Sequence, residues 1–85
     1  MKVKVYSTPI CTWCNRLKEF LRDNEIEFED FNVVEDKQAA REVIDKSDQL
    51  GVPVTDIDGK IIIGFDKKVL EKELRIRGGL NERNY

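Results

Sequence analysis

The chain has 85 residues, of which 40% are hydrophobic and 38% charged, and its net charge is −2. This length suits a single domain, and this composition allows a compact core and argues against a largely disordered chain. The absence of histidine excludes a Ser-His-Asp triad, a Cys-His nucleophile pair and histidine ligands to a metal.

Neither a membrane segment nor a signal peptide is expected. The longest apolar run, Ile61-Ile62-Ile63, is far too short to span a bilayer, and the first six residues contain no long apolar stretch. The basic spots at Lys67-Lys68 and Arg75-Ile76-Arg77 are more typical of a solvated helix face than of a nucleic-acid patch. We therefore expect a cytoplasmic monomer with no membrane or nucleic-acid partner.

The first half of the chain predicts a strand, a helix and a second strand. Residues Lys2–Tyr6 alternate polar and apolar side chains, and Ser7-Thr8-Pro9 ends that strand. Residues Glu27–Val34 predict the second strand, whose apolar side chains do not alternate strictly, as in a strand covered on both faces. The helix between them begins near Cys11 and has an apolar stripe at Trp13, Leu17, Phe20 and Leu21.

The third quarter of the chain predicts a second helix followed by a β-hairpin. Asp36 is suited to cap the helix, and Gly51 ends the segment. Asp58-Gly59 is a two-residue hairpin turn between strands at Val52–Ile57 and Lys60–Gly64. The apolar face of the helix consists of Ala39, Ala40, Val43 and Ile44.

A third helix closes the predicted fold. Asp66 is suited to cap it, and Phe65 and Leu70 have the spacing of a hydrophobic staple across that cap. Gly78-Gly79 stops the helix after about Arg77, and residues 78–85 form a C-terminal tail. The element order β-α-β-α-β-β-α predicts one α/β domain over residues 1–85, with a mixed four-stranded sheet and three helices on its two faces.

The pair Cys11 and Cys14 is the candidate redox centre. Cys11 is placed at a helix N-terminus, where free N–H groups and the helix dipole favour the thiolate over the thiol. Cys14 lies one turn further on the same side, so it can attack a mixed disulfide on Cys11. A static disulfide and a metal or iron–sulfur half-site are the alternatives, although two cysteines without histidine leave a tetrahedral site incomplete.

The chain from Val3 to about Leu74 resembles the glutaredoxin family, in particular its small bacterial and archaeal redoxins. Four stretches in order carry the resemblance: Tyr6-Ser7-Thr8-Pro9-Ile10-Cys11-Thr12-Trp13-Cys14, Gly51-Val52-Pro53-Val54, Asp58-Gly59-Lys60 and Gly64-Phe65-Asp66. The resemblance implies a thioredoxin-like fold. It also implies a cis Val52-Pro53 bond facing the cysteines.

The resemblance further implies a substrate- or glutathione-binding site. Its members are Thr8, Thr12, Trp13, Val52, Pro53, Gly64, Phe65 and Asp66. Trp13 is equally consistent with a core aromatic side chain, and Asp66 with a helix cap alone. Thr8 stands where many glutathione users have lysine, and Thr12-Trp13 replaces a common Pro-Tyr. Lys18, Lys46 and Gln49 are expected to be solvated helix residues more than carboxylate ligands.

These features together predict a glutaredoxin-like protein-disulfide reductase and electron carrier in cell redox homeostasis. Cys11 attacks a disulfide of a protein or small molecule, and Cys14 resolves the product. No metal or other cofactor is expected beyond the Cys11–Cys14 disulfide, with glutathione or a thioredoxin reductase-type flavoprotein as the electron donor. The alternative is a metal- or cluster-binding module that uses the same two cysteines.

Overall fold

The computed structural model describes residues 2–49 and 51–74. The elements follow the predicted order β-α-β-α-β-β-α: β1 (Val3–Ser7), α1 (Thr12–Asp23), β2 (Glu29–Asn32), α2 (Lys37–Ser47), β3 (Val54–Ile57), β4 (Lys60–Ile63) and α3 (Lys67–Leu74). The predicted tail at 78–85 and the predicted end of the third helix lie outside the described residues.

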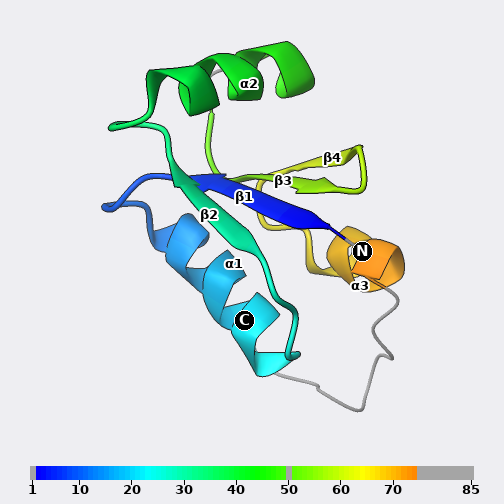
Figure 1. Cartoon of the computed structure of the whole chain (residues 1–85). Helices are drawn as coiled ribbons and strands as arrows, with labels where there is room; N and C mark the ends of the chain where they lie inside the picture. Colours follow the sequence, from blue (N-terminus) through cyan, green and yellow to red (C-terminus); the bar gives the residue numbers. More distant parts are fainter. Residues whose placement is uncertain (1, 50, 75–85) are drawn as a thin grey trace.

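The four strands form one mixed sheet in the order β2-β1-β3-β4. β1 is parallel to β2, β3 is antiparallel to β1, and β4 is antiparallel to β3. Figure 1 shows α2 on one side of the sheet, with α1 and α3 on the other. The predicted mixed four-stranded sheet with helices on both faces is therefore confirmed.

The alternation of side chains along β1 divides the core into two clusters. Val3 and Val5 face α1 and α3, whereas Tyr6 faces α2. The larger cluster lies on the side of α1 and α3 and consists of Val3, Val5, Leu17, Phe20, Leu21, Ile57, Ile62, Leu70 and Leu74. The smaller one lies under α2 and consists of Tyr6, Ala39, Val43 and Val54.

The second strand differs from the prediction in length and exposure. β2 has four residues rather than eight and lies at the edge of the sheet, where Glu29 and Asp30 are exposed. Apolar residues around it do contact both layers, since Phe28 packs on the larger cluster and Phe31 on the smaller. An edge position explains why this strand carries charges that a fully covered strand would exclude.

Local sequence signals set most of the turns. Asp36 caps α2 by accepting the N–H of Ala39 at 3.1 Å, as predicted. The hairpin turn is also as predicted, with positive φ at Asp58 (50°) and Gly59 (93°). The end of α2 is a correction, because Asp48, with a left-handed φ of 59°, terminates the helix before Gly51 is reached.

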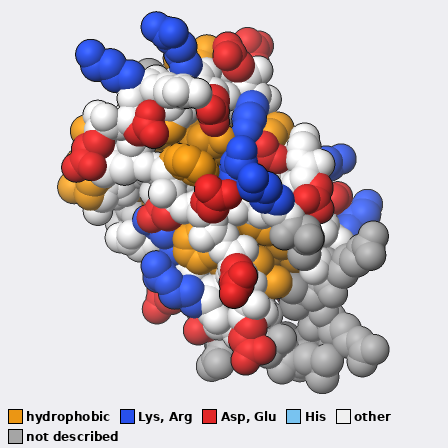
Figure 2. All heavy atoms as spheres, viewed as in Figure 1, with side chains coloured by type: hydrophobic (Ala, Val, Ile, Leu, Met, Phe, Trp, Pro, Cys, Tyr) orange, Lys and Arg blue, Asp and Glu red, His pale blue; other side chains and the backbone are white. Residues whose placement is uncertain are grey.

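The surface is mixed in charge. On the face shown in Figure 2, acidic and basic side chains lie interspersed, with hydrophobic side chains between them. Within residues 2–49 and 51–74, no helix has the length and apolar character needed to cross a membrane.

Candidate active site

Cys11 is the N-cap residue of α1. Its backbone is extended (φ −94°, ψ 113°), and its Sγ accepts the backbone N–H of Cys14 at 3.1 Å. This N–H group lies in the first turn of the helix, where backbone N–H groups have no carbonyl partner within the helix. The hydrogen bond and the helix dipole both stabilise negative charge on the sulfur. Cys11 is also partly exposed, so a substrate can reach it.

Cys14 has the opposite environment. It is completely buried, and burial together with the hydrogen bond to Cys11 raises the pKa of the Cys14 thiol to about 12. Both cysteines are free thiols in this structure. The two sulfurs therefore differ: the Cys11 sulfur is accessible and accepts a hydrogen bond, whereas the Cys14 sulfur is sheltered and keeps its proton.

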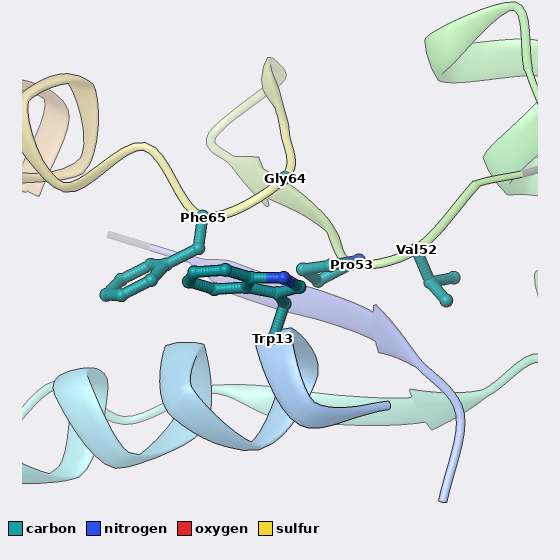
Figure 3. A pocket seen from close by; sticks show the side chains of 5 residues that line it. All are labelled: Trp13, Val52, Pro53, Gly64 and Phe65. Carbon is teal, nitrogen blue, oxygen red and sulfur yellow. The ribbon is translucent and has the colours of Figure 1, made fainter. Parts of the chain in front are cut away.

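An open cavity of about 290 Å³ lies beside this cysteine motif. Trp13 contributes to it from α1, Val52 and Pro53 from the segment before β3, and Gly64 and Phe65 from the segment between β4 and α3. Figure 3 shows the Trp13 indole between the Phe65 ring and the Pro53 ring in this view. Three segments that are far apart in the sequence thus form one largely apolar groove.

The Val52-Pro53 bond is cis, as the family resemblance implies. The Pro53 carbonyl accepts the N–H of Gly64 at 2.8 Å, which ties the segment before β3 to the segment after β4. Gly64 has a φ of 77°, a left-handed conformation that glycine adopts without strain. This hydrogen bond fixes one wall of the groove relative to the other.

Trp13 is not a core residue. Its side chain is 56% exposed, so the interpretation as a core aromatic residue is wrong, and its contact with a substrate stays a prediction. Its ring centroid is 6.3 Å from that of Phe65, and Phe65 in turn packs edge-on against the buried Phe20. The Arg16 guanidinium lies over the Trp13 ring, 5.2 Å from its centroid.

Residues 3–62 match the family model described as Glutaredoxin. The chain belongs to the glutaredoxin family. An uncharacterized glutaredoxin-like 8.6 kDa protein in the rubredoxin operon of Clostridium pasteurianum is 47% identical over 70 residues, which cover 82% of this chain and 93% of that protein.

Solved structures of glutaredoxin-like proteins have the same fold. A single-residue mutant of the thioredoxin-like protein BC3987 superposes with a TM-score of 0.85 and 34% identity, over 89% of this chain and 97% of the other. The glutaredoxin grx-1 from Archaeoglobus fulgidus superposes with a TM-score of 0.81 and 25% identity, over 87% and 86% of the two chains. The thioredoxin-like fold predicted from the sequence is therefore confirmed.

Three residues of the predicted glutaredoxin-type binding site do not line the groove. The Thr8 backbone lowers the pKa of the Cys14 thiol through a hydrogen bond, and Thr8 is not part of the groove lining. Thr12 is exposed in the first turn of α1. The Asp66 carboxylate accepts the N–H of Val69 at 3.3 Å, as predicted for a cap of α3. Their contacts with a substrate stay predictions.

Lys18 and Lys46 differ from the expectation of solvated residues. Lys18 Nζ lies 2.8 Å from Asp30 Oδ2, and only 13% of the Lys18 side chain is exposed. Lys46 Nζ lies 2.6 Å from Asp56 Oδ2 on the other face of the sheet. Both ammonium groups are already paired with carboxylates. Sequence reasoning missed these pairs, because each joins a helix to a strand and no local spacing indicates such a contact.

Within residues 2–49 and 51–74, no group of three or more histidine, cysteine or acidic side chains is gathered closely enough to hold a metal ion. The support for a thiol redox role comes from the geometry of the cysteine pair, which combines a helix N-terminus, one accessible sulfur and one buried sulfur, and from the glutaredoxin family match.

Proposed function

We propose that the chain is a dithiol thiol–disulfide oxidoreductase that reduces disulfides of other proteins. The observation that carries the proposal is the environment of Cys11, a partly exposed sulfur at the N-cap of α1 that accepts the N–H of Cys14. The buried thiol of Cys14 lies in the same helical turn. Membership of the glutaredoxin family supports the same chemistry.

The reaction proceeds in two exchanges. The Cys11 thiolate attacks one sulfur of the substrate disulfide, so that a Cys11–substrate disulfide forms and the other substrate sulfur leaves as a thiolate. Cys14 then loses its proton and attacks the Cys11 sulfur. The Cys11–Cys14 disulfide forms, and the second substrate sulfur leaves as a thiolate that takes up a proton. The substrate gains two electrons, and the protein loses two.

The groove favours a peptide segment as the substrate. The exposed face of Trp13 and the adjoining Phe65 and Pro53 offer apolar surface beside the reacting sulfur. In the described part of the chain, no hydrogen bond engages the Val52 backbone, which can therefore pair with an extended segment. In this proposal the protein acts as a monomeric electron carrier in the cytoplasm.

We assign the electron supply to a thioredoxin reductase-type flavoprotein rather than to glutathione. Lys18 and Lys46 are paired with Asp30 and Asp56, so neither is available for a glutathione carboxylate, and Thr8 supplies no charge. The midpoint potential of the Cys11–Cys14 couple should be about −270 mV, as in thioredoxin. Equilibration in redox buffers with thiol alkylation measures it, and a value of about −200 to −230 mV would favour glutathione.

The function is tested by trapping the first intermediate. Cys14→Ser protein, mixed with a peptide disulfide, should accumulate a covalent adduct on Cys11, because the resolving thiol has been removed. Intact-mass spectrometry before and after a strong dithiol detects the adduct and its reversal. Absence of an adduct, together with stoichiometric metal in anaerobically purified wild-type protein, would reject reductase activity in favour of metal binding.

A further inference from the structure

The ion pair of Lys18 and Asp30 includes a residue from the same helix face as the buried Cys14. Lys18 follows Cys14 by four residues on α1, so the two share one helix face. Side chains on a helix lean toward its N-terminus, and the Lys18 side chain therefore extends back over the turn that holds Cys14. The ammonium charge acts on the Cys14 thiol in the direction that favours the thiolate.

Two strands hold Lys18 in this place. Asp30, on β2, accepts a hydrogen bond from Lys18 Nζ at 2.8 Å through Oδ2. Its other oxygen, Oδ1, accepts the hydroxyl of Ser7 at 2.8 Å, and Ser7 is 2% exposed at the end of β1. The register places Asp30 opposite Val5, on the face of the sheet that α1 covers. The hydrogen bond from Ser7 orients the Asp30 carboxylate, and Asp30 in turn holds the Lys18 ammonium group in place.

The proposed mechanism needs a positive charge near the Cys14 sulfur. Cys14 must become a thiolate to resolve the mixed disulfide, yet its burial opposes that charge. The hydrogen bond that its N–H donates serves the sulfur of Cys11 and not its own. A hydrogen bond from the Thr8 backbone lowers the pKa of the Cys14 thiol, and the charge of Lys18 acts in the same direction, whereas the charge of Cys11 opposes it. Asp30 is paired with Lys18.

We propose that Lys18, held by Asp30 and Ser7, is a positioning residue that stabilises the Cys14 thiolate during resolution of the mixed disulfide. This inference rests on the proposed function. It assigns the two exchanges to different groups: the helix N-terminus assists attack by Cys11, and the Lys18–Asp30–Ser7 cluster, in which Lys18 and Ser7 are sheltered and Asp30 is partly exposed, assists attack by Cys14. A neutral residue at position 18 should therefore slow the second exchange and spare the first.

The size of the effect follows from thiol chemistry. A rise of one unit in the pKa of Cys14 lowers its thiolate fraction about tenfold. The more basic thiolate is also a stronger nucleophile by roughly threefold, so the net fall in the rate of attack is about threefold. We therefore expect Lys18→Met to slow resolution by about threefold or more near neutral pH, and to shift the pH profile of resolution to higher pH. Lys18→Arg keeps the charge and should restore both.

One equivalent of a symmetrical aromatic disulfide separates the two exchanges. The first coloured thiolate reports attack by Cys11, and the second reports resolution by Cys14, each followed by stopped-flow absorbance across pH. Lys18→Gln serves as a second neutral variant. Lys37→Met removes an exposed lysine on α2, across the sheet, and is the matched control.

The outcomes distinguish the inference from the proposed function. An unchanged first release with a slowed, pH-shifted second release in both neutral variants supports the role of Lys18. Equal second releases in wild type and both neutral variants at every pH would overturn it while leaving the reductase intact. No first release from wild-type protein would instead remove the proposed function itself.

Discussion

Replacing Cys11 with serine is expected to abolish disulfide reduction. The serine hydroxyl stays protonated near neutral pH, so the hydrogen bond from the Cys14 N–H and the helix dipole have no thiolate to stabilise. Removing a catalytic nucleophile closes the covalent route, and turnover should fall by on the order of a thousandfold or more. A coupled assay with a dithiol donor and a protein disulfide measures the loss.

Substitution of the residue that precedes Cys11 provides the control for that loss. Ile10 is 93% exposed and precedes Cys11 directly, so Ile10→Ser changes a neighbouring side chain without altering either sulfur. It should retain most of the turnover. Turnover by the Cys11→Ser protein at the wild-type rate would contradict the assignment of Cys11, and adduct formation on Cys14 in that variant would reverse the order of the two cysteines.

The features of the site that the sequence predicted are those set by neighbouring residues. A Cys-x-x-Cys that follows a strand and opens a helix places Cys11 at the N-cap whatever the rest of the chain does. The Asp58-Gly59 turn and the Asp36 cap have the same local origin, because each depends on the conformation of two to four residues. The family resemblance added the cis Val52-Pro53 bond.

The features that were not predicted depend on which elements meet in space. The Lys18–Asp30 pair joins a helix to the next strand, and Lys46–Asp56 joins another helix to a strand on the opposite face. Charged residues on amphipathic helices are usually solvated, so composition alone favoured that interpretation. The contact between the Trp13 and Phe65 rings likewise joins α1 to the segment between β4 and α3.

The ionic network under α2 should make a large contribution to stability. Lys46 Nζ donates to Asp56 at 2.6 Å and to the hydroxyl of the buried Tyr6 at 2.9 Å, and that hydroxyl donates to Glu42 at 2.6 Å. Burial alone would lower the pKa of Lys46, but the hydrogen bonds to Asp56 and Tyr6 outweigh it and raise this pKa. For Asp56, burial opposes the charge, yet Lys46 and the N–H of Gly59 lower its pKa.

Lys46→Met should therefore destabilise the fold in a pH-dependent way. Removing one partner of a fully buried pair costs about 3–5 kcal/mol, and we expect about 2 kcal/mol at pH 7 because 27% of the Lys46 side chain is exposed. The lowered pKa of Asp56 stabilises the fold above its ordinary value of 3.8 and ceases to do so as pH falls through the folded-state pKa. The raised pKa of Lys46 adds stability that is present below 10.5 and is lost only above that pH.

Urea unfolding of wild-type and Lys46→Met protein at pH 7 and at about pH 3.5 tests this expectation. The difference in the free energy of unfolding should shrink at the lower pH, because Asp56 then takes up a proton in the unfolded chain, where its pKa is ordinary, and this offsets part of the stability that the pair with Lys46 supplies. Lys37→Met, an exposed lysine at the start of the same helix, should change stability by less than about 0.5 kcal/mol at either pH. An equal difference for Lys46→Met at both pH values would show that packing of the lysine chain, and not its charge, supports the fold.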